Sequence, residues 1–209
     1  SNEFIIWGDA MYSYSKQYGL SLEKITKIGS VVHDQTFQIK KRKNNVKDYI
    51  LVAAQGPLNM HSRDYTIKAH EEYENIIRTI CKIAKQNNIK LIIKLHPYEN
   101  DNLESSIAKE IGSNISVITK GDIIPLIQSC KFMISISTSI SNVILDGHIL
   151  QKPVIRIPFG EWFGPRDQFR QPSCYNIKLN EFDLILKRLF SDENFYDILV
   201  SQGSEFVNN

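Results

Sequence analysis

Short apolar runs alternate with amphipathic patterns along most of this chain. Five such runs predict buried β-strands over residues 49–54, 90–95, 115–118, 132–136 and 154–157. Between the first two runs, apolar residues recur at helical spacing over residues 65–87, which predicts one long amphipathic helix. Similar spacing predicts further helices after Asp101, after Asp122, over residues 139–150 and beyond residue 179.

This order of strands and helices predicts a doubly wound α/β domain. Strands that are apolar almost throughout are typical of a parallel sheet covered on both faces, and right-handed crossovers place helices on those faces. We therefore expect residues 48–189 to form a Rossmann-like doubly wound parallel sheet with helices on both faces. The expected strand order, counted within the domain, is 3-2-1-4-5-6.

The first 47 residues follow a different pattern. Residues 1–34 hold two apolar runs, over 4–7 and 25–28, on either side of a tyrosine-rich segment that predicts a short helix. They are interpreted as a fragment of another domain, packed at the margin of the sheet. Residues 35–47 are largely polar and predict a linker or a long surface loop, so that residues 48–209 form the main domain. The chain begins without methionine, and we expect residue 1 to lie inside a longer protein.

Composition narrows the class of protein. The 209 residues include 42% hydrophobic and 23% charged residues, which excludes a collagen, a disordered tail and a disulfide mini-protein. The formal net charge of +2 supplies no global attraction to nucleic acid. Three widely spaced cysteines predict buried thiols, and no apolar run nears the ~18 residues of a membrane helix. We expect a cytoplasmic protein, and the basic run at residues 40–43 leaves peripheral membrane contact as an alternative to a solvated face.

Candidate chemistry lies in the loops after the strands, where ligands of open parallel sheets bind. Thr138, Ser139 and Ser141 fall where a strand gives way to a predicted helix, whose N-terminus carries unpaired N–H groups and about half a positive charge. This arrangement suits phosphate, although a simple helix cap is an equal alternative. Asp146, seven residues after Ser139, would then lie two turns along the helix. Its carboxylate could accept a hydrogen bond from a ribose hydroxyl, and the alternative is that it is solvated.

Two further loops complete the candidate site. Gln55 and Gly56 follow the first strand of the domain, and His96 and Pro97 follow the second. The His96 imidazole can donate to a phosphate oxygen or protonate a leaving phosphate, so His96 is the candidate catalytic residue. The alternative is that His96 has a purely structural role. The remaining histidines lack metal-ligand spacing, so we expect no metal site. The long aromatic loop over residues 158–172 is expected to close over a base or to face a partner domain.

Several of these segments, taken in order, resemble the C-terminal, donor-binding half of GT-B glycosyltransferases. The similarity is strongest to the CDP-glycerol glycerophosphotransferases and the capsular and polysialic-acid transferases. It rests on Lys94-Leu95-His96-Pro97, on residues 122–127, on residues 137–141 and on Lys152-Pro153-Val154-Ile155. The resemblance implies that His96, Thr138, Ser139 and Ser141 hold the donor diphosphate and that Asp146 reaches the ribose. The chain departs from the families at Gln151, where glycine is frequent, and at Asp146, where glutamate is also common.

The resemblance also implies a function and a missing partner. The donor would be a CDP- or UDP-linked sugar or similar nucleotide-diphosphate, with no separate cofactor, used in surface-polysaccharide biosynthesis. Residues 1–34 would be the hinge-region fragment that ends the acceptor-binding N-terminal half. The rest of that half is absent, so this chain is expected to bind donor and to be inactive alone. Two alternatives remain: one half of a UDP-N-acetylglucosamine 2-epimerase-like enzyme, and a nucleotide-binding module without catalysis.

Overall fold

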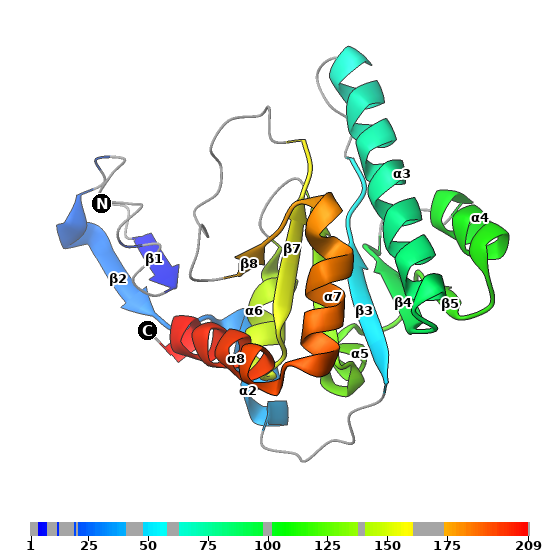
Figure 1. Cartoon of the computed structure of the whole chain (residues 1–209). Coiled ribbons are helices and arrows are strands. Elements are labelled where there is room, and N and C mark those ends of the chain that lie inside the picture. Colours follow the sequence, from blue (N-terminus) through cyan, green and yellow to red (C-terminus); the bar gives the residue numbers. More distant parts are fainter. Residues whose placement is uncertain are drawn as a thin grey trace.

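A six-stranded, all-parallel β-sheet forms the centre of the computed structural model, which describes residues 4–7, 12, 19, 21–40, 48–57, 63–97, 102–137, 141–160 and 174–208 (Figure 1). The sheet order is β5-β4-β3-β6-β7-β8. Counted within the domain, this is the predicted order 3-2-1-4-5-6, which is confirmed. The strands are β3 (Tyr49–Ala54), β4 (Lys90–Leu95), β5 (Ile115–Ile118), β6 (Phe132–Ser137), β7 (Val154–Pro158) and β8 (Tyr175–Asn176).

Helices cover both faces of this sheet, as predicted. Alternate residues of β3 point to opposite faces, so Ile50 and Val52 belong to one hydrophobic cluster and Leu51 to another. The first cluster packs against α3 (Arg63–Gln86), α4 (Asn102–Ile111) and α7 (Phe182–Ser191), and the second against α5 (Ile124–Ser129) and α6 (Asn142–Ile149). In Figure 1, α7 lies in front of the strands and α6 behind them. A short 3-10 helix, η4 (Leu179–Glu181), leads into α7, and the last helix, α8 (Glu193–Asn208), contacts both α6 and α7.

The N-terminal segment forms its own small unit. Strands β1 (Phe4–Trp7) and β2 (Ile25–Ile28) pair in a separate, two-stranded parallel sheet. The 3-10 helices η1 (Leu22–Lys24) and η2 (Val31–His33) flank β2, and α2 (Asp34–Lys40) then packs against α6. The tyrosine-rich helix predicted between β1 and β2 lies almost entirely outside the described residues.

Helix α2 corrects the prediction that residues 35–47 form a linker. Residues 34–40 are helical because Thr36 and Ile39, three positions apart, share one face that packs toward α6 and the second hydrophobic cluster. Helix α6 differs too, since it begins at Asn142 rather than at Ser139. Residues 138–140 lie outside the described part of the chain.

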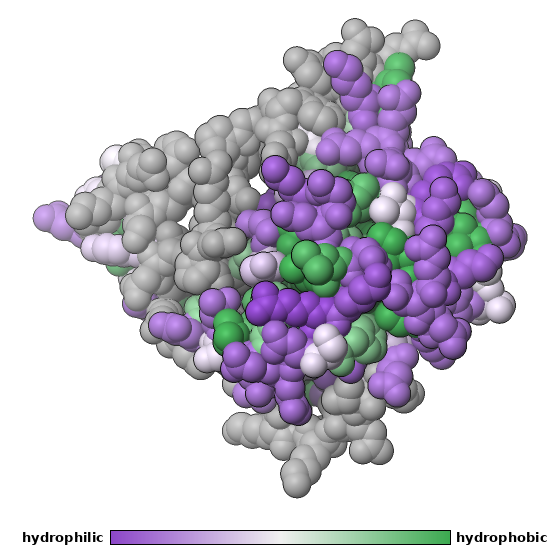
Figure 2. Space-filling view, viewed as in Figure 1, coloured by the Kyte–Doolittle hydropathy of each residue, from purple (hydrophilic) through white to green (hydrophobic). Residues whose placement is uncertain are grey.

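The described residues on the face shown in Figure 2 are predominantly polar. Figure 2 shows hydrophilic residues over much of this face, with apolar side chains in small separate groups. None of the described helices combines the length and hydropathy needed to cross a bilayer.

The three cysteines are free and buried, and burial raises the pKa of the Cys81 and Cys130 thiols to about 12, so neither is a thiolate near neutral pH.

Candidate functional site

A pocket of about 360 Å³ lies beyond the carboxyl ends of β3, β4 and β6. Strand β3 is the point at which the sheet order reverses, because β4 continues the chain on one side and β6 on the other. Doubly wound sheets bind ligands at this switch point. The polar residues that line the pocket are Gln55, Lys94, His96, Asp122, Ser137 and Ser141.

The structure brings together four of the predicted site residues and separates the others. Gln55, His96, Pro97 and Ser141 line the pocket, and Gly56 follows directly after Gln55 without lining it. Asp146 is also absent from the lining. Thr138 and Ser139, which are also predicted site residues, lie outside the described residues.

Backbone hydrogen bonds hold the pocket loops at the edge of the sheet. The N–H of Gln55 donates to the carbonyl of Ile136 over 2.9 Å, and the N–H of His96 donates to the carbonyl of Ala54 over 3.2 Å. These bonds continue the parallel ladder one residue past the ends of the strands. As a result, the loop after β3 begins beside the end of β6, and the loop after β4 begins beside the end of β3.

The N-terminus of α6 faces this pocket through Ser141. Ser141 is the N-cap, with extended backbone at φ −101° and ψ 134°, and its side chain makes no capping hydrogen bond. The first turn of α6 carries no acidic residue. A helix start of this kind presents backbone N–H groups, a hydroxyl and the positive end of the helix dipole, all of which favour an anion.

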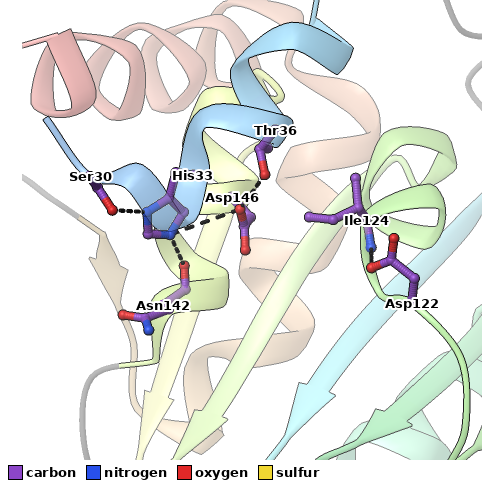
Figure 3. Close-up of polar contacts among 7 residues, drawn as sticks. All are labelled: Ser30, His33, Thr36, Asp122, Ile124, Asn142 and Asp146. Carbon is purple, nitrogen blue, oxygen red and sulfur yellow. Dashed lines mark hydrogen bonds and ion pairs between the residues drawn. The ribbon is translucent and has the colours of Figure 1, made fainter.

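Lys94 is a pocket residue for which the sequence suggested no role. Its side chain is only 4% exposed, and its ammonium Nζ donates to the carbonyl oxygens of Leu95 at 2.9 Å and Thr119 at 3.1 Å. Burial lowers the pKa of Lys94, and the Asp122 carboxylate opposes that effect. The carboxylate of Asp122 accepts from the N–H of Ile124 at the start of α5 (Figure 3).

Asp146 belongs to a separate polar network between the N-terminal segment and α6 (Figure 3). Its Oδ1 accepts from the Thr36 hydroxyl at 2.7 Å and lies 3.9 Å from Nε2 of His33. That Nε2 donates to the carbonyl of Asn142 at 3.3 Å, while in the neutral ring Nδ1 accepts from the Ser30 hydroxyl at 2.6 Å. Burial raises the pKa of Asp146, and the Thr36 hydrogen bond opposes the increase. The network therefore fixes η2 and α2 against the first turns of α6.

The described residues show no metal-binding arrangement. Within the described ranges, no group of three or more histidine, cysteine, aspartate or glutamate side chains gathers as a metal site requires. The polar groups that the pocket offers are hydrogen-bonding side chains, one buried ammonium, one imidazole and the carboxylate of Asp122.

The switch-point pocket and the sheet order define a Rossmann-like domain of the GT-B type. A glycosyltransferase from Rickettsia africae ESF-5 matches 99% of this chain with a TM-score of 0.56 and 14% identity, and the chain covers 57% of that protein. WaaG, a glycosyltransferase involved in lipopolysaccharide biosynthesis, matches 98% with a TM-score of 0.52 and 11% identity, and 58% of it is covered.

Epimerases share the same fold. The UDP-GlcNAc 2-epimerase of Methanocaldococcus jannaschii, solved with UDP-GlcNAc and UDP, matches 94% of this chain with a TM-score of 0.57 and 16% identity. The chain covers 57% of that protein as well, so it spans less than two thirds of each of these three structures. No protein-family model and no curated protein matches the sequence. Similarity at this level of identity establishes the fold.

Proposed function

We propose that the pocket binds the nucleoside diphosphate of an activated donor, and that the chain is the donor-binding domain of a GT-B glycosyltransferase or glycerophosphotransferase. The observation that carries the proposal is the meeting of Ser141 at the α6 N-terminus with Gln55 and His96 at the switch point of the sheet. A volume of about 360 Å³ is within the usual range for small-molecule sites.

Each pocket residue has a chemical role in this proposal. The N–H groups that begin α6 and the Ser141 hydroxyl donate to the diphosphate, with Thr138 and Ser139 assigned the same task from the resemblance. Gln55, Gly56 and Pro97 shape the loops that border the ligand. The His96 imidazole donates to a phosphate oxygen and, as a general acid, stabilises the leaving diphosphate.

The N-terminal segment supports the existence of a second half. Phe4, Ile5, Val31 and Val32 are exposed apolar residues of this segment, with Ile5 62% exposed. A two-stranded sheet is marginally stable alone, so further strands and apolar contacts are expected around β1 and β2. We assign acceptor binding and the catalytic base to that half of a longer protein. Such a protein would serve surface-polysaccharide biosynthesis in the cytoplasm, where the basic run at 40–43 would allow peripheral membrane contact.

An epimerase is the second candidate, favoured by the structural match to the UDP-GlcNAc 2-epimerase. The two activities differ in what they need. An epimerase converts UDP-N-acetylglucosamine without an acceptor, whereas a transferase releases the nucleotide only when an acceptor accepts the sugar. Product analysis of the longer protein with UDP-N-acetylglucosamine, with and without an acceptor mixture, separates them. A protein that binds no nucleotide would contradict both.

Replacing His96 with alanine should weaken binding of a nucleoside diphosphate about tenfold and leave nucleoside binding nearly unchanged. The imidazole is exposed at the pocket mouth, so we expect the lower end of the range for a hydrogen bond to a charged group. Calorimetric titration with both ligands measures the difference. His70→Ala, an equal change at an exposed position of α3, is the control. Equal losses for both ligands, or no loss, would remove His96 from the phosphate site.

Asp146→Asn should weaken nucleosides and nucleoside diphosphates alike, by about two- to tenfold, if Asp146 accepts from the ribose. Figure 3 shows the second carboxylate oxygen directed away from Thr36, and we assign the proposed ribose contact to that oxygen. Thr36→Val is the matched control because it removes the partner of Oδ1 and keeps the carboxylate. Equal effects of the two substitutions on affinity would show that Asp146 acts only through the packing of α2 on α6.

A further inference from the structure

Lys94 places a buried positive charge at the carboxyl edge of the sheet. The residue lies in β4, in register with Ala53 of β3, and so faces the side of the sheet covered by α5 and α6. Its bonds to the carbonyls of Leu95 and Thr119 hold Nζ beyond the ends of β4 and β5, where the side chain lines the pocket.

The described surroundings of Lys94 supply hydrogen bonds but no opposite charge in contact with it. An ammonium group has three N–H donors, and the two carbonyls, both neutral, use two of them. None of the ion pairs among the described residues includes Lys94. The Asp122 carboxylate acts on Lys94 only at longer range, and its Oδ1 is engaged by the N–H of Ile124.

A buried charge without a paired counter-charge is unfavourable, and a ligand that brings the opposite charge offsets that cost. Lys94 lines the pocket, and the α6 N-terminus with Ser141 lines the same pocket. Both features attract an anion. Lys94 belongs to β4 and α6 follows β6 in the chain, and these two strands lie on opposite sides of β3.

We propose that Lys94 is a donor-binding residue whose third N–H bonds a phosphate oxygen of the nucleoside diphosphate. The inference rests on the proposed function and adds to it the group that neutralises the phosphate charge. It also gives a physical reason for a lysine to lie at a buried strand position. A purely structural lysine, in contrast, would only link the ends of β4 and β5 through its two carbonyl bonds.

Lys94→Met is the test, because methionine keeps the length of the side chain and removes its charge. We expect the affinity for whichever of CDP, UDP and GDP binds the unmodified chain best to fall about ten- to a hundredfold, with nucleoside affinity changed by less than about threefold. Lys120→Met is the matched control, since Lys120 is an exposed lysine just before the pocket residue Gly121, and we expect less than a twofold effect. Lys94→Gln, which retains hydrogen bonding without charge, replaces Lys94→Met if the latter does not fold.

The possible outcomes separate this inference from the function on which it rests. Unchanged diphosphate affinity in a folded Lys94 variant overturns the inference and leaves the proposed function in place. Equal losses for nucleoside and diphosphate also overturn it, since they indicate a structural lysine. Failure of the unmodified chain to bind any of the three diphosphates contradicts the proposed function itself, and the inference fails with it.

Discussion

Replacing Ser141 with alanine should lower the affinity for a nucleoside diphosphate about ten- to a hundredfold and leave the free energy of unfolding nearly unchanged. The hydroxyl lines the pocket at the start of α6, where a donated hydrogen bond to a charged phosphate contributes about 1.5–3 kcal/mol. Its side chain makes no capping bond, so truncation removes no intrahelical partner. The Ser141→Ala substitution is therefore expected to lower the affinity for a nucleoside diphosphate without lowering the free energy of unfolding.

Calorimetric titration and urea unfolding of the same variant measure the two quantities. Ser135→Ala is the matched control because Ser135 lies in β6, is buried and does not line the pocket, and its hydroxyl oxygen has no hydrogen-bond partner among the described residues. We expect that control to bind like the unmodified chain. A loss of about 1 kcal/mol of stability in Ser141→Ala with unchanged affinity would identify the hydroxyl as a helix cap and remove it from the phosphate site.

The 209-residue chain should bind donor and transfer nothing to an acceptor, which is the largest effect expected here. Transfer needs an acceptor surface and a base that we assign to the other half of a longer protein, and the chain covers 57% of the Rickettsia glycosyltransferase. Its turnover should equal the uncatalysed background, whereas intact enzymes commonly reach roughly 1–1,000 per second. Mass spectrometry of donor and acceptor mixtures measures product, with the longer protein as the positive control. Product formed by the chain alone, above background, would contradict the assignment.

The central sheet was predictable because buried parallel strands are continuous apolar runs. Residues 49–54 are all buried in β3, and the same pattern located β4, β5, β6 and β7. The order of strands followed from the doubly wound arrangement that alternating strands and helices indicate. The sixth strand of the expected order, β8, was not located in the sequence because it has two residues, Tyr175 and Asn176, which are too few to show a period.

Features that depend on distant partners were not predictable in the same way. Thr36 and Asp146 are 110 residues apart, and nothing in the sequence near either residue indicates that their side chains form a hydrogen bond. The polar composition of residues 35–47 concealed α2, whose burial depends on its contact with α6. The predicted strand over residues 90–95 contains two lysines, Lys90 and Lys94. Only the fold shows that Lys90 is exposed and that Lys94 is buried.

The candidate site was partly predictable because strand ends and a helix start carry recognisable residues. Gln55, His96 and Ser141 follow strands that the sequence located well, so their convergence follows from the topology. The helix start was placed three residues early, at Ser139 instead of Asn142, since a run of hydroxyl residues offers several equivalent caps. The assignments of Thr138 and Ser139 stay predictions, as does the ribose contact of Asp146.

Isothermal titration of the unmodified chain with CDP, UDP and GDP, each compared with its nucleoside, tests the central claim most directly. We predict saturable binding at one site for at least one diphosphate, with an affinity at least about tenfold higher than that of the matching nucleoside. That preference is the result expected from the phosphate contacts that we propose for the α6 start, His96 and Lys94. Absence of binding by all three diphosphates, or nucleosides that bind as tightly as their diphosphates, would contradict it.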